Sequence, residues 1–329
     1  MKKLINAPET VLAEALDGFA AAHSDILALG AERKFVRRNR LTPGKVALVS
    51  GGGSGHEPLH AGFVGFGMLD AACPGQVFTS PTPDQIFAAT AAVDGGAGVL
   101  LIVKNYEGDV MNFQMAADLA GKDIATVVTD DDVAVEKSTW STGRRGVAGT
   151  LIVEKIVGAA AEQGASLSQL KTLGEQVNRQ TRSLGVALTS CTVPAVGKPT
   201  FTLGEDEMEF GVGIHGEPGR RRVKLSSADT IAEEMVSAIV KDLAPGRGVE
   251  ALLFVNGFGG TPAMELYLMV NSALRVLRKK GLNVSRFLTG NYVTSLEMAG
   301  CSITVSLLDA ELRALWDAPV QTAALRWGI

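Results

Sequence analysis

Short apolar runs alternate with segments of helical periodicity in the first half of the chain, and this alternation limits the fold more than any other feature. Apolar runs that suit buried strands cover residues 45–50, 98–104 and 124–130, and segments with helical spacing at 83–93 and 110–120 separate them. Strands joined by helical crossovers run parallel, with helices on both faces of the sheet. We therefore expect an α/β fold built on a largely parallel sheet.

Further along the chain, segments of helical character give way to strand-like segments, which indicates a second structural unit. Residues 149–163 and 167–184 have helical character, whereas residues 185–194 and 208–214 are strand-like. We place the boundary near Leu184, which gives an N-terminal domain of residues 1–184 and a C-terminal domain of residues 185–329. Each is expected to be an α/β domain with a mixed or largely parallel sheet covered by helices.

Four further elements complete the expected framework. An amphipathic helix is predicted from Ala7 to about Leu29, because its apolar residues recur at helical spacing. Apolar runs at 251–256 and 302–308 predict buried strands. A helix is predicted to begin with Thr261 as N-cap and Pro262 as its first residue, and to run to about Lys279.

Composition excludes several classes of protein. The 329 residues are 46% hydrophobic and 20% charged, which suits a globular chain that can divide its core between two domains. A net charge of -4 without a long basic run argues against nucleic acid as a partner. No signal peptide or run of roughly 20 apolar residues is evident, so we expect neither secretion nor a membrane span. Three cysteines without CxxC spacing indicate a reducing cytoplasm, and neither a disulfide framework nor a zinc site.

The most conspicuous motif is a glycine-rich segment that follows the predicted strand 45–50. It reads GGGSGHEPLH over residues 51–60 and holds two of the four histidines in the chain, His56 and His60. Glycines let backbone amides approach a ligand closely, and the N-terminus of a following helix would favour an anion. Because loops after parallel strands carry binding sites, we expect a ligand site here in preference to a plain flexible turn.

Residues 56–60 also spell H-E-x-x-H, the pattern of zinc peptidases. Two zinc ligands four residues apart must share one face of a continuous helix, but Pro58 is tolerated only in the first turn of a helix. His56 would then lie in the loop before the helix, and no third ligand is evident. We therefore expect no metal site, and we interpret His60 as a packed or capping residue.

A second glycine-rich segment, GVGIHG at residues 211–216, matches the dinucleotide fingerprint G-x-G-x-x-G. The fingerprint needs a helix to begin inside it, whereas the sequence Glu217-Pro218-Gly219 predicts a turn. No G-x-x-x-x-G-K-[ST] phosphate loop occurs either, so no nucleotide site is expected on this chain. His215 is left between glycines, where a structural histidine and a reactive one are both compatible with the sequence.

A third candidate segment begins where the predicted strand 98–104 ends. Lys104 and Asn105 lie at the carboxyl end of that strand, where ligand-binding residues of parallel sheets collect. Asp109 follows at the start of a helix and could be only an N-cap. The strand-end position of Lys104 favours a functional interpretation.

These segments resemble the K subunit of dihydroxyacetone kinases in three long motifs that occur in the same order. The motifs are GGGSGHEP at 51–58, KNY at 104–106 with GDVMNF at 108–113, and GVGIHGEPG at 211–219. The resemblance extends over nearly the whole chain and includes GQVFTSP at 75–81 and NGFGGTP at 256–262.

The resemblance implies a role for each matching residue. His215 would form a covalent hemiaminal with the ketone carbon of a short ketose, His56 would be the general base on the hydroxyl that attacks phosphorus, and Asp109 would assist or orient it. The implied contacts to the triose come from Gly53, Ser54, Gly55, His56, Lys104, Asp109 and His215. A neutral imidazole is nucleophilic at cytoplasmic pH, and a second one nearby can accept a proton.

The resemblance also implies partners. The family has forms with a fused ATP-binding domain and forms with a separate L subunit, and because the sequence stops at Ile329 we expect the separate type. ATP or ADP with magnesium would then lie on the L partner, which a phosphotransferase-system protein recharges in many bacteria, and this chain would bind no cofactor and form a homodimer. Two alternatives stay open: a kinase subunit for a four-carbon, erythrulose-type ketose, and a non-catalytic coactivator that senses dihydroxyacetone.

Overall fold

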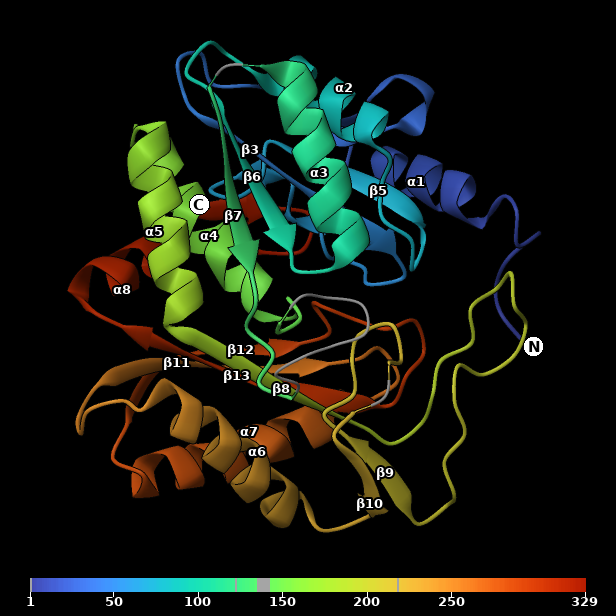
Figure 1. Ribbon diagram of the computed structural model, residues 1–329, viewed down its shortest axis with the longest axis vertical. Coiled ribbons are helices and arrows are strands. Elements are labelled where there is room, and N and C mark those ends of the chain that lie inside the picture. The colour runs from blue at the N-terminus through green and yellow to red at the C-terminus, as the bar shows by residue number, and fades with distance from the viewer. Residues whose placement is uncertain (1, 122, 135–142, 218) are drawn as a thin grey trace.

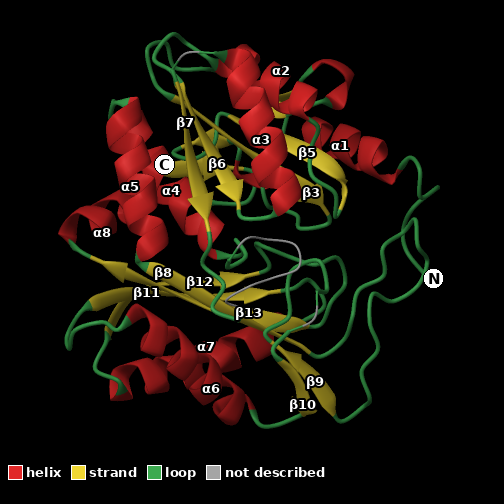
Figure 2. Cartoon of the chain, in the orientation of Figure 1, coloured by secondary structure: helices red, strands yellow, loops and turns green. Residues whose placement is uncertain are grey.

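Two sheets stacked with layers of helices make up the molecule (Figure 1; Figure 2). The computed structural model describes residues 2–121, 123–134, 143–217 and 219–329. Within these residues the strands form two six-stranded sheets and one small three-stranded sheet. The α/β class expected from the sequence is confirmed.

The first sheet has the strand order β1-β2-β5-β3-β6-β7. Its centre is parallel, because β3 pairs in parallel with β5 and β6, and β6 with β7, whereas β1 and β2 add an antiparallel edge. The strands are β1 (Leu27–Leu29), β2 (Val36–Arg38), β3 (Ala47–Ser54), β5 (Ala71–Val77), β6 (Val99–Lys104) and β7 (Ile124–Thr129).

The second sheet is mixed and mainly antiparallel, with the order β10-β9-β8-β13-β11-β12. Only β11 and β12 run parallel. The strands are β8 (Thr181–Ala187), β9 (Glu207–Phe210), β10 (Arg221–Lys224), β11 (Glu250–Gly257), β12 (Asn283–Gly290) and β13 (Gly300–Leu308). The small sheet joins β4 (Gly65–Phe66), β14 (Val320–Thr322) and β15 (Arg326–Trp327).

Successive side chains of the central strands point to opposite faces of the sheet and pack into separate cores. Along β6, Leu100 and Ile102 enter a core shared with the second sheet, whereas Leu101 and Val103 pack under α2 and α3. Helix α4, buried almost throughout, contacts strands of both sheets and lies between them (Figure 1). On the far face of the second sheet, α6 and α7 cover a third core. The helices are α1 (Val11–Ala22), α2 (Pro83–Val93), α3 (Glu107–Ala120), α4 (Gly149–Glu162), α5 (Leu167–Arg179), α6 (Ala228–Leu243), α7 (Ala263–Lys279) and α8 (Ala310–Asp317), with short 3-10 helices η1 (Ala31–Arg33) and η2 (Ala61–Phe63).

Several expected boundaries were wrong in the N-terminal half. The first helix ends at Ala22, and its expected last residues form β1, which pairs with β2. Ser24 and Asp25, both poor helix formers, lie between the two elements. Strand β3 continues to Ser54, so three of the glycines in residues 51–55 are strand residues paired with β5. After the motif only the 3-10 helix η2 forms, with His60 as its N-cap, and the expected helix N-terminus is absent from this described segment.

Expected boundaries also moved in the second half. Helix α5 ends at Arg179, and residues 181–187 form β8, so Leu184 lies inside a strand of the second sheet. The division into domains at that residue stays a prediction. Thr261 is not an N-cap: its hydroxyl donates to the carbonyl oxygen of Gly300, and Pro262, in an extended conformation, is the N-cap of α7.

Candidate active site

A cavity of ≈ 440 Å³ brings together residues from both halves of the chain. Gly53 near the end of β3, Phe78 after β5, and Asp109 in the first turn of α3 line it from the first sheet. His215 and Glu217, in the turn that follows β9, line it from the second. The cavity therefore lies outside the carboxyl ends of parallel strands, where ligand sites of such sheets collect.

His56 has one ring nitrogen committed and one free. Its ring is buried and stacks on Phe78, with centroids 5.0 Å apart. Nδ1 lies 2.7 Å from the carbonyl oxygen of Thr294, an acceptor only, so Nδ1 carries the proton and donates it. Burial, and then the neighbouring His215 and Lys104, lower the pKa of His56 well below its ordinary value. The ring is therefore neutral, and its Nε2, which has no partner among the described residues, is a proton acceptor.

His215 is oriented by Glu217, two residues further along. Nδ1 of His215 lies 3.0 Å from Oε1 of Glu217, and the backbone N–H of His215 donates to Oε2 of the same carboxylate at 2.8 Å. Burial alone would raise the pKa of Glu217, but His215 and Arg145 lower it to about 2, so this side chain is a carboxylate. With Nδ1–H donated to Glu217, the lone pair of His215 Nε2 is available as a nucleophile.

The two histidines are neighbours in space although 159 positions separate them in the sequence. Their ring centroids are 4.7 Å apart in an edge-on arrangement, and the ring of Tyr106 meets His215 at the same centroid distance, 4.7 Å. A nucleophilic imidazole and a basic imidazole thus lie side by side at one cavity.

Three buried polar atoms near the cavity have no hydrogen-bond partner among the described residues: Nε2 of His56, Oδ1 of Asp109 and the hydroxyl oxygen of Tyr106. Native proteins seldom leave such atoms unpaired, because each costs the desolvation of a polar group. Their gathering here indicates a site that is completed by a polar ligand with hydroxyl groups.

The other predicted residues lie near the site in different ways. Gly53 lines the cavity, whereas Ser54 lies beside it with its hydroxyl donated to the carbonyl oxygen of Gly75. Gly55 has a φ of +101°, and a side chain there would collide with Phe78. Lys104 is only 1% exposed and contacts Asp109 Oδ2 at 3.2 Å. The site roles of these residues stay predictions.

Sequence reasoning missed Glu217 and Tyr106 as site residues. Glu217 stood within the third motif but was treated only as part of a turn, and its spacing of two residues from His215 was the available signal. Pro218 of that turn lies outside the described residues. The match to G-x-G-x-x-G does not reflect a dinucleotide site, because residues 211–216 form turns and no helix begins among them. Gly213 is needed for packing, since a side chain there would lie 2.1 Å from the Glu217 carboxylate.

The H-E-x-x-H pattern does not form a zinc-peptidase site. His56 and His60 do not share a helix, and their Nδ1 atoms contact the Thr294 carbonyl oxygen and the Glu154 carboxyl group, respectively. A search of the residues described by the structure finds no cluster of three or more His, Cys, Asp or Glu side chains suited to a metal ion. The same part of the chain contains no helix that is long and apolar enough to span a membrane.

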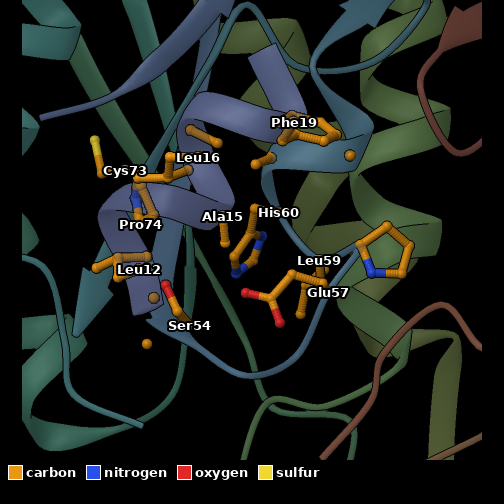
Figure 3. A pocket seen from close by; sticks show the side chains of 16 residues that line it. Leu12, Ala15, Leu16, Phe19, Ser54, Glu57, Leu59, His60, Cys73 and Pro74 are labelled. Carbon is orange, nitrogen blue, oxygen red and sulfur yellow. The ribbon is translucent and has the colours of Figure 1, made fainter. Parts of the chain in front are cut away.

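A second cavity of ≈ 330 Å³ lies next to the first and shares Gly53 with it. Leu12, Ala15, Leu16 and Phe19 of α1 line one part of it, and His60 lines another (Figure 3). Its lining is mainly apolar, whereas the first cavity is lined by both His215 and Asp109, so the first cavity is the candidate active site.

Comparison with known proteins places the chain in a family. The Dak1 domain model matches residues 17–324. The chain is 53% identical to the PTS-dependent dihydroxyacetone kinase 1, dihydroxyacetone-binding subunit DhaK of Listeria innocua, over 94% of this chain and 95% of that protein. It is 42% identical to the L-erythrulose kinase of Pectobacterium atrosepticum, of which it spans 57%.

Solved structures share the fold over almost the whole chain. The dihydroxyacetone kinase of C. freundii in complex with AMP-PNP and Mg²⁺ superposes with a TM-score of 0.89 at 32% identity, covering 99% of this chain and 61% of that one. The dihydroxyacetone kinase operon co-activator Dha-DhaQ also gives 0.89, at 36% identity, covering 94% of this chain and 97% of that one. The chain therefore belongs to the family of dihydroxyacetone kinase K subunits, which carry the Dak1 domain.

Proposed function

We propose that this chain is the substrate-binding subunit of a dihydroxyacetone kinase and holds the ketose on His215 as a hemiaminal. The observation that carries the proposal is the hydrogen bond of His215 Nδ1 to Glu217, which leaves Nε2 free beside the neutral His56. Nε2 adds to the ketone carbon as the C=O π bond breaks, the former carbonyl oxygen takes up a proton from water, and the Nδ1 proton leaves through the Glu217 carboxylate, so that the adduct has a hydroxyl group and a neutral ring.

Phosphorylation requires a base for the terminal hydroxyl of the bound ketose. His56 Nε2 is neutral and unpaired, and it accepts the proton as the hydroxyl oxygen attacks phosphorus. Oδ1 of Asp109, unpaired among the described residues, accepts a hydrogen bond from a second hydroxyl group of the bound ketose and thereby orients the reacting one. Gly53 lines the cavity, and a side chain there would collide with the backbone of Phe78 and Thr79, so a glycine is needed for this wall of the cavity to pack closely.

The phosphoryl group comes from a separate L-type subunit that carries ATP or ADP with Mg²⁺. The relative from Listeria innocua is described as PTS-dependent, which supports a phosphotransferase-system protein as the donor that recharges the partner. We also propose that the chain forms a homodimer and acts in the cytoplasm in glycerol and dihydroxyacetone metabolism. Its three cysteines are buried and free, which fits a reducing compartment.

The proposal is tested by assaying the purified chain with and without a purified L-type partner, on dihydroxyacetone, erythrulose and glycerol. We expect phosphorylation of dihydroxyacetone only when the partner is present, and little reaction of glycerol, which has no carbonyl carbon. Robust ATP-dependent turnover by the chain alone would contradict the proposal that the nucleotide lies on the partner subunit. A preference for erythrulose would show that the substrate is a four-carbon ketose, and the proposed chemistry on His215 and His56 would stay the same.

A coactivator role is the second candidate, since the structure of a co-activator superposes well on this chain. A sensor needs a group that captures the ketose but no group for phosphoryl transfer. This chain has candidates for both, because His56, beside His215, and Asp109, in the cavity lining, each have a buried atom without a partner among the described residues. Ketose binding without turnover in the presence of a competent partner would favour the sensor.

A further inference from the structure

Four buried side chains form a continuous line that leads away from the proposed site into the core. Asp109 Oδ2 lies 3.2 Å from Lys104 Nζ, and Lys104 Nζ lies 3.1 Å from Nε2 of His60. His60 Nδ1 lies 2.6 Å from Oε1 of Glu154, on the central helix α4. The proposed chemistry uses only the first member of this line, and the remaining three have no role in it.

The donors and acceptors in this line have one consistent direction. The ammonium group of Lys104 has three N–H donors, and the structure gives them three acceptors: Asp109 Oδ2, His60 Nε2, and the carbonyl oxygen of Gly51 at 3.3 Å. Nε2 of His60 must therefore accept, which places the ring proton on Nδ1, where Oε1 of Glu154 at 2.6 Å and Oγ of Ser50 at 3.0 Å can accept it. Burial and the charge of Lys104 lower the pKa of His60 well below its ordinary value, which agrees with a neutral ring.

This arrangement is more than a way to fill the core. Glu154 is completely buried, and its Oε2 has no partner within the described residues. Apolar residues of similar volume are often as stable as a buried polar network, or more so, because they avoid the desolvation of polar groups. A polar line that ends at the site is therefore better explained by what it does for Asp109 than by stability.

We propose that His60 and Glu154 are positioning residues for phosphoryl transfer: Glu154 fixes the His60 ring, which holds Lys104 against Asp109. This inference rests on the proposed function, in which Asp109 orients the reacting hydroxyl. With Oδ2 held by Lys104, the carboxylate has one rotational setting, and Oδ1 is kept available to the substrate. Lys104 then acts through Asp109 and not by contact with the ketose.

Two substitutions at His60 separate this role from packing. In His60→Gln the side-chain amide reaches as far as Nε2, so its oxygen can still accept from Lys104. In His60→Asn the amide reaches only as far as Nδ1, so it can donate to Glu154 but loses Lys104. We expect His60→Gln to keep kcat within about threefold of wild type, and His60→Asn to lower kcat by about tenfold or more with little change in KM.

A double-mutant cycle with Asp109→Asn tests whether His60 acts through Asp109. If it does, His60→Asn lowers kcat in the wild-type background but has almost no further effect in the Asp109→Asn background. Equal losses in the two backgrounds, or equal losses for His60→Gln and His60→Asn, would overturn the proposal. If His60→Asn does not fold, Glu154→Leu replaces it in the same cycle, with Glu154→Gln, which keeps an acceptor for Nδ1–H, as its matched control.

The same measurements distinguish this inference from the proposed function. All variants are assayed with the L-type partner, and ketose capture on His215 is followed separately by intact-protein mass spectrometry. Failure of the wild-type chain to capture or phosphorylate ketose would remove the proposed function itself. Normal wild-type activity with no coupling between His60 and Asp109 would remove only the positioning role.

Discussion

At the scale of single residues, the account depends on which nitrogen of each histidine carries the proton. Thr294 and Glu217 accept from Nδ1 of His56 and His215, respectively, and leave both Nε2 atoms free. Two rings of one residue type thereby take different tasks. Burial keeps His56 neutral and suited to accept a proton, whereas the carboxylate of Glu217 makes His215 the better nucleophile.

The first prediction separates transfer from capture. His56→Ala and Asp109→Ala should still form the ketose adduct on His215 but lose turnover by a factor on the order of 10² or more, because each removes a group needed only when the hydroxyl attacks. Adduct formation is followed by intact-protein mass spectrometry and turnover by a coupled assay with the L-type partner. Near wild-type turnover in both variants would show that the assigned roles are wrong.

The sequence located the candidate site residues but not their surroundings. His56, Asp109 and His215 could be singled out because glycines and strand ends mark them, and the structure brings all three to one site. The carbonyl oxygen of Thr294, which fixes the His56 tautomer, is 238 positions away from it. No local pattern predicts a contact between such distant segments, and the partnership of His60 with Glu154 was hidden for the same reason.

At the scale of secondary-structure elements, strand β3 carries part of the function in its backbone. A side chain at Gly52 would place its Cβ 2.1 Å from Lys104 Nζ. The glycine is therefore needed for close approach by Lys104. The added Cβ would meet the terminal nitrogen of a flexible lysine side chain. The fold can accommodate it if this side chain moves, but Lys104 would then leave its position in the site.

The second prediction follows from this contact. Gly52→Ala should fold and retain thermal stability close to that of wild type, yet it should lower kcat by about tenfold or more, because it displaces Lys104 from Asp109. Gly18→Ala in α1, where no atom lies within 4 Å of the added Cβ, is the matched control and should leave kcat unchanged. Full activity of Gly52→Ala would contradict the role given to Lys104.

The third prediction concerns helix α4 and pH. Burial raises the pKa of Glu154 from 4.5 to about 8, so the folded protein retains a proton that the unfolded chain releases above pH 4.5. The stability contributed by this proton is complete below pH 4.5 and is lost as pH rises towards 8. The gain of Glu154→Gln over wild type should therefore increase with pH across this window, by up to about 1.4 kcal/mol per pH unit.

Denaturant unfolding of both proteins at several pH values between 5 and 8 measures this difference. Glu175→Gln, an exposed substitution on α5, is the control and should show no such trend. A constant difference between Glu154→Gln and wild type across the range would show that Glu154 is ionised in the folded protein throughout.

Element types were easier to predict than their ends. The helices at 83–93 and 149–162 and the strand at 99–104 follow from periodicity, because their apolar residues face a core along their whole length. The segment 27–29 looked helical in continuation of α1 but pairs with β2, and residues 181–184 looked helical but pair with β13. In both cases, pairing with a strand distant in the sequence outweighs local preference.

At the scale of the whole molecule, the site exists only because two sheets meet. The first sheet supplies Gly53 and the loop with His56, α3 supplies Asp109, and the turn after β9 in the second unit supplies His215. Helix α4, between the sheets, carries Glu154 and thereby links the common core to the line of side chains that reaches Asp109. The capture of the ketose and the activation of its hydroxyl are thus assigned to residues from different parts of the chain that meet at one cavity.

The most direct test of the central claim is ¹³C NMR of dihydroxyacetone labelled at its carbonyl carbon and bound to the protein. The account predicts a protein-bound resonance in the region of tetrahedral carbon that is distinct from the free ketone and its hydrate, and that is absent with His215→Ala. Labelled glycerol, whose carbons are already tetrahedral, should show no new resonance displaced from that of the free compound. A bound signal that stays in the ketone region, or a tetrahedral signal that persists in His215→Ala, would contradict covalent capture by His215.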